Sequence, residues 1–437
     1  MAQPILIYTT KVTNRLRFTF NFIFRDILLS EIKLTSDVEE FKNHPGPKFS
    51  YAQHPLNDEL FFQARSILFE TGITDQNITV FEYGSGKVFF ATGKASALPY
   101  DPFAASFYLL SRYEEYLPHI RDVYDRFDVK ESLAFRNNFL QMPVVDQWAM
   151  KIKEIIKQKF PSFEFSERKY KYVSTIDIDN AYAYKEKGVL RTLGGYARAL
   201  KELDGRDLKE RTKVFLGRMQ DPYDTYDDQL AIQKKYKINC IYFFLLADYG
   251  ENDKNVPVHS RKFQSLIKSL GDHAAIGIHP SFGSNKHPEK IKTEVGRLSH
   301  IVNAEVTKSR QHFLILNFPY TYRNLIEVDI TDDYTMGFAG SIGFRAGTCT
   351  PFNFYDLDME VETKLRLHPF AVMEATLKYY MKVEPNNAIA AIKPLVDEIR
   401  KVKGTFYSLW HNESMSNNRN WNGWKDVYEE MVKIAVE

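Results

Sequence analysis

In the segment YVSTIDIDNAY, Asp177 and Asp179 have a spacing that suggests metal binding and acid–base chemistry. On an extended strand, residues two apart point to the same side and lie about 7 Å apart along the chain. Two like charges facing one site repel each other unless a cation offsets them. A divalent ion does so, and it leaves one carboxylate free to act as a base. The alternative is that the pair only ends a strand in solvent or caps a helix.

Two histidines that belong to short apolar segments are further candidates for the same site. His279 in AAIGIHPSF stands directly before Pro280, which blocks a strand, so its imidazole is expected where a strand passes into a loop. His312 lies in KSRQHFLIL, where it alternates with Arg310 along one side of the segment. Neutral imidazole binds zinc and similar metals, and an arginine can hold a carboxylate in its ionised form. Each of these residues could instead be structural.

Another histidine and an arginine complete the set of polar candidates. His411 ends the apolar run GTFYSLW, and an imidazole there could donate a proton to a departing amine. Arg345 lies among glycines in MGFAGSIGFRAGTC, where the backbone can approach a ligand closely. It is a candidate for an anion or sugar contact, and a tight structural turn is an equal alternative. The aromatic residues Tyr182 and Trp410 could hold a sugar ring near the site.

Strands and helices alternate from residue 170 onward, a pattern that would bring these side chains together. We predict strands at 171–177, 240–246, 274–278, 312–316 and 405–410, and helices at 226–236, 263–270, 288–302, 389–399 and 424–436. Such alternation favours an α/β fold in which helices cover a parallel sheet or barrel. In parallel barrels the reactive groups gather where strands end and loops begin.

Residues 1–165 are predicted to form a separate, smaller α+β domain of unknown role. Predicted strands cover 5–10, 16–24, 79–83 and 87–91, and a Gly-Ser-Gly turn joins the last two into a hairpin. Asp101 and Pro102 are typical of a helix start, and a further helix is predicted at 145–160. The charged segment 161–171 marks the boundary, and the second domain spans 170–437.

The composition argues against several classes of protein. The 58 basic and 56 acidic residues nearly cancel, so no general attraction to nucleic acid or to an anionic membrane is expected. Two cysteines in 437 residues exclude a disulfide framework. The sequence contains no uncharged apolar run that could cross a membrane and no clear signal peptide, so we expect a cytoplasmic protein.

From about residue 170 to 437, the sequence resembles the polysaccharide deacetylase (NodB-like) superfamily, in a branch with an extra N-terminal domain. The run DPFAASFYLLSRYEEY also looks like that branch. The resemblance implies a distorted (β/α) barrel, with Asp177 as catalytic base and Asp179 as metal ligand. STIDIDN matches the acidic opening motif of the family in kind, as D-x-D where the family has adjacent aspartates.

The other family motifs are matched in part. The second motif has two histidines four positions apart. His279 matches the first, a glycine stands at the second, and His312 is the expected substitute, with His287 as an alternative. Arg310 matches the arginine that orients the base. His411, in LWHN, matches the histidine that acts as acid.

The resemblance implies a metal-dependent hydrolase that removes acetyl groups from N-acetylated sugars of a polysaccharide or glycan precursor. Its cofactor would be a divalent ion, expected to be zinc, held by Asp179, His279 and His312. Two alternatives remain open. A chain that keeps the barrel and lacks a ligand would bind glycan, or serve polysaccharide assembly, without cleaving it. A hydrolase of small cyclic amides would need a closed cleft rather than an open groove.

Overall fold

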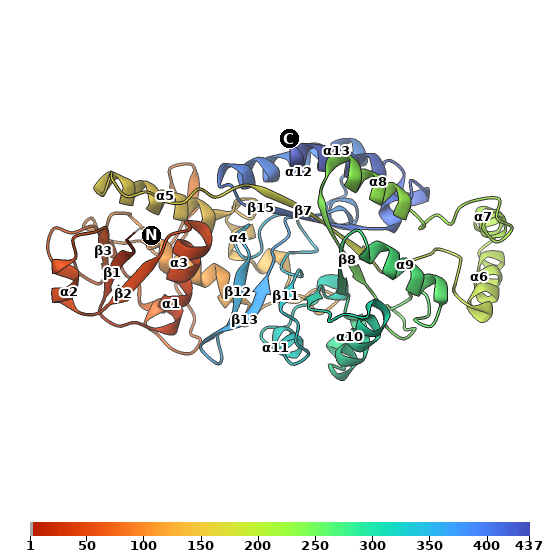
Figure 1. Cartoon of the computed structure of the whole chain (residues 1–437), viewed down its shortest axis with the longest axis horizontal. Coiled ribbons are helices and arrows are strands. Elements are labelled where there is room, and N and C mark those ends of the chain that lie inside the picture. The colour runs from red at the N-terminus through yellow and green to blue at the C-terminus, as the bar shows by residue number, and fades with distance from the viewer. Residues whose placement is uncertain (1–2) are drawn as a thin grey trace.

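A four-stranded parallel sheet forms the N-terminal part of the computed structural model, which describes residues 3–437 (Figure 1). Its strand order is β2-β1-β3-β4. The strands are β1 (Ile5–Thr9), β2 (Ile32–Thr35), β3 (Lys48–Ala52) and β4 (Phe61–Gln63). Parallel neighbours need a crossover connection, and α1 (Asn14–Asn21) supplies it between β1 and β2. This pairing differs from the separate strands and helices expected of an α+β domain.

The predicted strand at 16–24 is wrong, because this segment is helical. Helix α1 is followed by a π-helical turn at Phe22–Ile27. The helix begins at Thr13, whose hydroxyl accepts the N–H of Leu16 at 3.1 Å. Most faces of this segment are buried, so apolar residues surround the helix and conceal its period. Phenylalanines at every second position then imitate the alternation of a strand.

The remaining hairpin and helix predictions for this part are confirmed, although the second strand of the hairpin ends at Val88 and not at residue 91. Strands β5 (Phe81–Tyr83) and β6 (Gly86–Val88) form the predicted antiparallel hairpin. Helix α3 (Pro102–Leu110) begins at Asp101, whose carboxylate accepts the N–H groups of Phe103 and Ala104. The helix predicted at 145–160 is α5 (Val144–Lys159). The short helices α2 (Val38–Asn43) and α4 (Leu133–Arg136) complete this part.

A nine-stranded sheet forms the larger part of the molecule, in the order β12-β13-β11-β10-β9-β8-β7-β15-β14. Its strands are β7 (Lys171–Ile178), β8 (Asn239–Phe244), β9 (Ala275–Ile278), β10 (Lys308–Ser309), β11 (Asp332–Asp333), β12 (Phe352–Asp356), β13 (Val361–Leu367), β14 (Val372–Met373) and β15 (Thr405–His411). All neighbours pair in parallel except β12 and β13. The fold is therefore mixed α/β, and the carboxyl ends of the parallel strands share one edge.

This ladder does not form the predicted closed barrel, because β12 and β14 are its two edges over the residues that the structure describes. The chain between β13 and β14 nevertheless bonds to both flanks. His368 donates its N–H to Asp333 O at 2.8 Å, and Ala371 donates to Tyr407 O at 3.2 Å. The segment between β13 and β14 is therefore hydrogen-bonded to β11 on one side of the sheet and to β15 on the other. These bonds keep the sheet curled.

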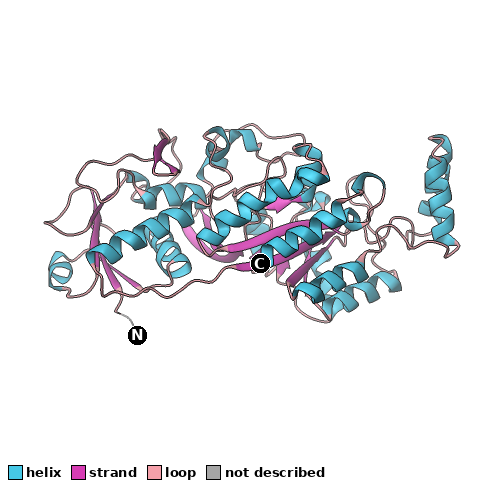
Figure 2. Cartoon of the chain, turned by 90° about the horizontal axis from the view of Figure 1, so that it is seen from above, coloured by secondary structure: helices cyan, strands magenta, loops and turns pink. Residues whose placement is uncertain are grey.

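The helices predicted around this sheet are confirmed to within a few residues, as Figure 2 illustrates. They are α8 (Tyr226–Tyr236), α9 (Arg261–Gly271), α10 (Glu289–Val302), α12 (Pro385–Lys401) and α13 (Trp424–Val436), and the short α11 (Tyr320–Ile326) was not foreseen. The strand predicted at 312–316 is wrong. Phe313 and Leu314 have φ of 59° and 57°, so the chain turns within the predicted strand, and only the two-residue β10 before it is extended and paired.

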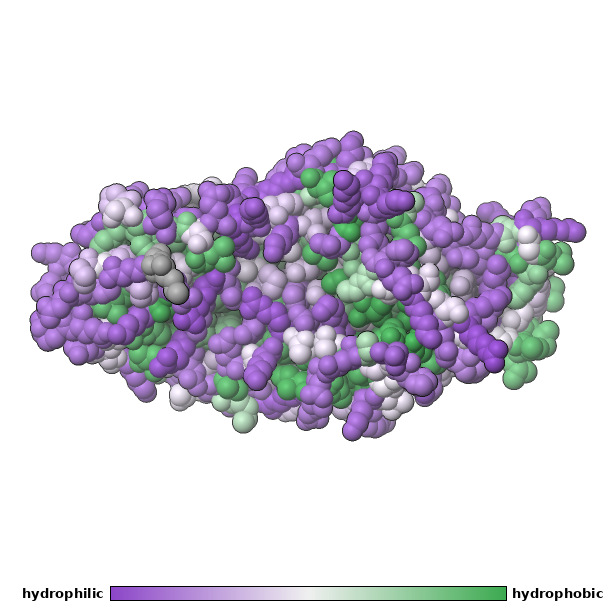
Figure 3. All heavy atoms as spheres, in the orientation of Figure 1, coloured by the Kyte–Doolittle hydropathy of each residue, from purple (hydrophilic) through white to green (hydrophobic). Residues whose placement is uncertain are grey.

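One apolar core joins the two parts, since a single buried cluster includes residues of both sheets. The rings of Phe18 and Tyr355 lie 5.0 Å apart across this junction. A hairpin of two helices, α6 (Val189–Lys201) and α7 (Gly205–Phe215), projects from the body (Figure 1). Its apolar side chains are exposed at one end of the molecule (Figure 3), with Leu203 90% exposed. No helix within 3–437 is long and apolar enough to cross a membrane.

Candidate metal centre

The carboxyl ends of four parallel strands carry the predicted catalytic and metal-binding residues. Asp177 lies on β7, and Asp179 follows its last residue. His279 directly follows β9, Arg310 and His312 come just after β10, and His411 is the last residue of β15. Because these strands are parallel, their ends meet at one edge of the sheet, and residues up to 234 positions apart in the chain come together there.

Asp179, His279 and His312 converge and form the arrangement that we call the metal centre. They offer one ligand atom each, and these atoms all lie within 4.8 Å of one another. The distances to the two oxygens of Asp179 are 3.1 Å from His279 Nε2 and 3.5 Å from His312 Nε2. Both histidines are buried, whereas the side chain of Asp179 is 30% exposed. The centre is therefore open on the aspartate side.

Hydrogen bonds at Nδ1 orient both histidine rings. His279 Nδ1 lies 2.5 Å from the carbonyl oxygen of Arg310, and His312 Nδ1 lies 2.9 Å from Asp253 Oδ1. Neither acceptor has a proton to give when Asp253 is ionised, so Nδ1 carries the hydrogen. In the neutral ring, Nε2 then presents its lone pair to the centre. This is the tautomer that a metal-binding histidine needs.

The carboxylate of Asp179 is also suited to bind a cation. Asp179 Oδ1 is buried and has no hydrogen-bond partner within the part of the chain that the structure describes. A buried carboxylate oxygen is costly unless a donor or a positive ion satisfies it. One carboxylate oxygen and two imidazole nitrogens form a donor set typical of zinc sites with an open coordination position.

The pKa shifts show that the carboxylates and the histidines of this region interact strongly. Burial acts to raise the pKa of Asp179, but His312 and His279 overcome this and hold it well below its usual value. Burial acts to lower the pKa of His312, whereas Asp179 and Asp253 raise it to about 9. The carboxylates are thus ionised and draw positive charge from any group in reach, which a bound divalent ion would supply.

Arg310 holds Asp177 in place beside the centre. Its Nη1 donates to Asp177 Oδ1 at 2.9 Å, and its other donors reach Thr175 Oγ1 at 2.7 Å and Tyr334 O at 3.0 Å. The guanidinium is fully buried, so its position is well defined. The second oxygen of Asp177 lies 3.8 Å from His279 Nε2. Asp177 therefore has one oxygen occupied and one directed at the metal centre, as a general base requires.

His411 is held by a buried glutamate. Glu374 Oε1 accepts both the backbone N–H of His411, at 2.9 Å, and its ring Nδ1, at 2.8 Å. The other ring nitrogen lies 3.7 Å from Asp179 Oδ2. Burial acts to lower the pKa of His411, but Glu374 and Asp179 raise it well above the usual value. The imidazole therefore presents a protonated nitrogen toward the centre.

Sequence reasoning missed Glu374 and Asp253, the partners of His411 and His312. Glu374 directly follows β14, so the strand-end pattern that revealed the other residues would have found it, had this two-residue strand been recognised. Asp253 lies in the loop after β8, well beyond the end of that strand, and no local signal marks it. Both are buried and ionisable, a property that only the folded chain reveals.

Two predicted substrate contacts lie away from the centre. Arg345 is 2% exposed, and it pairs with the buried Glu115 at 2.9 Å. Trp410 is fully buried and packs against Tyr428, with 5.4 Å between the rings. Side chains alternate along a strand, so Trp410 faces helix α13 while its neighbour His411 faces the centre. Neither side chain is available to touch a sugar.

Of two further candidates, Tyr182 remains possible and His287 is ruled out as a ligand of this centre. Tyr182 comes three residues after Asp179 and is half-buried, with its ring 6.3 Å from that of Tyr226. It stays a candidate for substrate contact. His287, the alternative metal ligand, is an exposed residue 3.4 Å from Glu289 and does not join the metal centre.

Comparisons with known proteins give remote likenesses only. A family model described as a family of unknown function (DUF7033) matches residues 5–161. No curated protein matches the chain.

Solved structures that are similar to part of this chain include two proteins described as polysaccharide deacetylases and one pseudoenzyme. A protein assigned to the polysaccharide deacetylases from Mycobacterium smegmatis is 12% identical, with 62% of this chain and 86% of that chain covered and a TM-score of 0.41. The polysaccharide deacetylase Bc1974 from Bacillus cereus is 10% identical over 61% and 88%, with a TM-score of 0.30. A CE4 family pseudoenzyme from Bacillus anthracis is 10% identical over 60% and 62%, with a TM-score of 0.27. These likenesses are too remote to assign an activity to this chain.

Proposed function

We propose that this chain is a metal-dependent hydrolase that removes acetyl groups from N-acetylated sugars of a polysaccharide or glycan precursor. The observation that supports the proposal is the convergence of three side chains that could hold a metal ion with the carboxylate of Asp177, held by Arg310, and the imidazole of His411, held by Glu374. Hydrolysis of an amide needs a base for water, an acid for the amine and stabilisation of the carbonyl oxygen. The resemblance of the sequence to polysaccharide deacetylases suggests the acetamide as the amide.

Asp179, His279 and His312 would hold the cation, for which we propose zinc. When bound, a divalent ion there supplies Lewis acidity to a carbonyl oxygen and to water. The carboxylate of Asp253 and the carbonyl of Arg310 keep the two imidazoles in the orientation that ligation requires.

The remaining chemistry belongs to two side chains. Asp177 accepts a proton from the water that attacks the acetamide carbon, and Arg310 keeps this carboxylate ionised and in position. His411 donates its Nε2 proton to the nitrogen as the C–N bond breaks, and Glu374 balances the positive charge of the ring. Acetate and the free amine of the sugar are the products.

The non-catalytic alternative accounts for fewer features of the site. A protein that only binds or assembles glycan needs neither a proton acceptor nor a proton donor beside a cation. Here both are present, and each is held by a buried partner, Arg310 or Glu374. Buried charged pairs are costly to maintain, so this arrangement favours the catalytic function.

The test combines elemental analysis with acetate release from N-acetylglucosamine oligomers. Wild type should contain one zinc equivalent and release acetate. Asp179→Ala should lose both, whereas Asp272→Ala, at an exposed aspartate at the end of α9, should keep both. Retention of acetate release by Asp179→Ala would refute the assignment. Metal binding by wild type without acetate release from any N-acetylated oligosaccharide would favour the non-catalytic alternative.

A further inference from the structure

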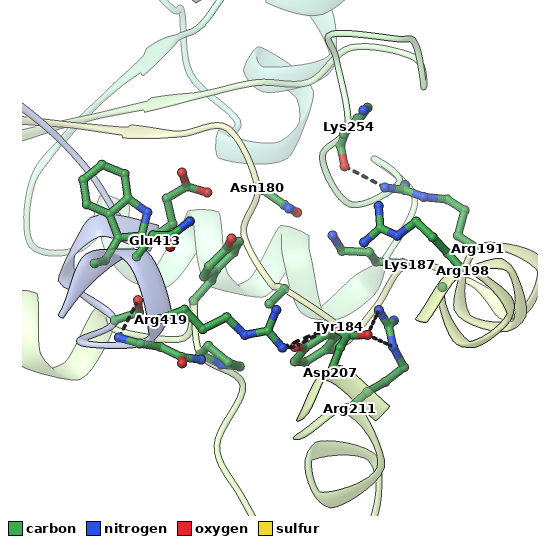
Figure 4. A pocket seen from close by; sticks show the side chains of 18 of the residues that line it. Asn180, Tyr184, Lys187, Arg191, Arg198, Asp207, Arg211, Lys254, Glu413 and Arg419 are labelled. Carbon is green, nitrogen blue, oxygen red and sulfur yellow. Dashed lines mark hydrogen bonds and ion pairs between the residues drawn. The ribbon is translucent and has the colours of Figure 1, made fainter. Parts of the chain in front are cut away.

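A cavity of 620 Å³ lies beside the metal centre and has no part in the steps above (Figure 4). Two of its lining residues link it to the centre, because Asn180 is next to Asp179 in the chain and Glu413 is two residues from His411. The rest of the lining includes helices α6 and α7, from the projecting hairpin. A substrate at the metal centre could therefore extend into this cavity.

Three cations point into the cavity from the hairpin side, namely Lys187, Arg191 and Arg198 (Figure 4). Lys187 has no hydrogen-bond or ion-pair partner within residues 3–437. Arg191 donates only to the carbonyl oxygens of Asn255 and Lys254, at 2.8 and 2.6 Å, so its orientation is fixed and its charge is not neutralised. The three cations thus converge without a counter-charge of their own.

The carboxylates of the cavity do not supply that counter-charge. Asp207 is already paired with Arg211 at 3.0 Å and with Arg419 at 3.4 Å. Glu413 lies across the cavity from the three cations (Figure 4), and in the chain it is two residues from His411. The nearest acid to Arg198 is Glu202, 4.0 Å away, and both of these side chains are more than 60% exposed, so that pair contributes little.

The lowered pKa of Lys187 shows that its positive charge is unfavourable in this position. Burial first, and then the neighbouring Arg191, lower its pKa to about 8, and the carboxylates of Asp221 and Glu413 oppose this shift without cancelling it. Like charges that face one space are unfavourable unless an anion occupies it. Arginine and lysine side chains are also the groups that proteins use to bind carboxylates and phosphates, through charge-assisted hydrogen bonds.

Aromatic side chains also line the cavity. Tyr223, Tyr379 and Trp421 contribute to this lining. Aromatic rings pack well against the apolar faces of sugars, and their polar ends remain available for hydroxyl groups. The cavity therefore combines a surface suited to a sugar with a positively charged end.

We propose that this cavity binds an anionic substituent, a carboxylate or a phosphate, on a sugar of the chain whose N-acetylated residue lies at the metal centre. The substrate would thus be an acidic glycan. The part of the inference that concerns the substrate rests on the proposed function, whereas binding of the anion itself does not.

The test measures binding of two probes, inorganic phosphate and glucuronic acid, to the full chain by calorimetry at low salt. Wild type should bind at least one of them with a millimolar or lower Kd, and added salt should weaken the binding. Lys187→Gln and Arg198→Gln should each weaken it by about tenfold, as expected for the loss of a charge-assisted hydrogen bond. The probe that binds more tightly identifies the substituent as phosphate or carboxylate.

Arg206→Gln is the matched control, because Arg206 is an exposed cation of α7 that does not line the cavity. It should bind the probes like wild type. Circular dichroism of each variant shows that it is folded. Equal binding by Lys187→Gln and Arg206→Gln, or no binding of either probe by folded wild type, would overturn the inference.

Asp179→Ala separates this inference from the proposed function. It should still bind the anionic probe, because Asp179 is not part of the cavity lining. If wild type binds zinc and releases acetate but binds neither probe, only the cavity inference fails. If it binds a probe but neither zinc nor substrate, only the proposed function fails.

Discussion

The side chains around the metal centre are held by partners that are not themselves candidate metal ligands or proton carriers. Arg310 holds Asp177, Asp253 holds the ring of His312, and Glu374 holds the ring of His411. Each partner is buried, so its position is set by packing and not by solvent. Such support keeps reactive groups in one geometry and avoids the cost of ordering them during the reaction.

Glu374→Gln keeps the shape of this partner and removes its charge. We expect kcat to fall by about tenfold to a hundredfold, because the proton donor loses the group that stabilises its protonated form. The alkaline limb of the pH–rate profile should move to lower pH, since a carboxylate beside His411 raises its pKa and an amide does not. Zinc content should be unchanged. A variant with wild-type kcat and pH profile would show that Glu374 has only a structural role.

Asp253→Asn affects the metal centre and not the proton donor. The amide oxygen accepts the Nδ1–H of His312 more weakly than the carboxylate does, and the amide can present its N–H2 group instead, so zinc affinity should fall by about tenfold to a hundredfold. Competition with a chelator of known affinity measures this change. Glu374→Gln is the control, since it should keep the affinity of wild type. The assignment of His312 as a ligand is contradicted if both variants bind zinc equally well.

Much of the site was predictable from the sequence because one rule covers it. Asp177, His279 and His411 each stand at or next to the end of an apolar strand, and the ends of parallel strands share one edge. Whether a side chain at such a strand end is buried in the core or exposed at the site was not predictable in this way. Trp410 looked like a sugar platform, but whether it faces the site or the core depends on strand alternation in the folded sheet.

At the scale of elements, β9 shows how tightly the strands beneath the centre are packed. A Cβ atom on Gly277 would come within 2.6 Å of the Phe243 ring and 2.9 Å of the carbonyl oxygen of Lys308 on β10. Phe243 in turn lies 4.7 Å from the guanidinium of Arg310. The glycine therefore allows the close approach of strands that places His279 and Arg310 side by side.

Gly277→Ala should lower the free energy of unfolding by about 1–3 kcal/mol, as overpacking of a filled core does. Gly296→Ala is the matched control, because Gly296 lies in helix α10 and a Cβ there meets open space. That variant should gain about 0.5–1 kcal/mol from the helix preference of alanine. Chemical denaturation of both variants measures the difference. The packing argument fails if the two substitutions have the same effect.

Elements with a clear period were predictable, and buried or very short ones were not. Helices α9, α10 and α12 each show one apolar face, so their spacing predicted them. Helix α1 is buried on most faces and shows no such period. Strands β10, β11 and β14 have two residues each, too few for a pattern, although β10 and β14 each lead directly to residues of the site.

At the scale of the whole molecule, a buried ion network joins the N-terminal part to the larger sheet. Glu115 accepts hydrogen bonds from Arg112 at 2.7 Å and from Arg345 at 2.9 Å. All three residues are at most 5% exposed. The glycine-rich segment around Arg345, predicted as a possible ligand loop, thus serves to pack the two parts together.

Glu115→Ala leaves two buried arginines without their shared carboxylate. We expect a loss of about 3–5 kcal/mol in the free energy of unfolding, because a buried charge that loses its partner is strongly destabilising. Since one apolar core spans both parts, unfolding should remain a single transition in wild type and variant. Calorimetry checks both statements. Two separate transitions in wild type would show that the parts are independent.

The most direct measurement of the central claim is a crystal structure of the protein soaked with zinc, with anomalous scattering recorded at the zinc edge. The account predicts one strong anomalous peak in contact with Asp179, His279 and His312, with Asp177 and His411 beside it and outside the ligand shell. A peak at other residues, or none at this site under saturating zinc, would contradict the account.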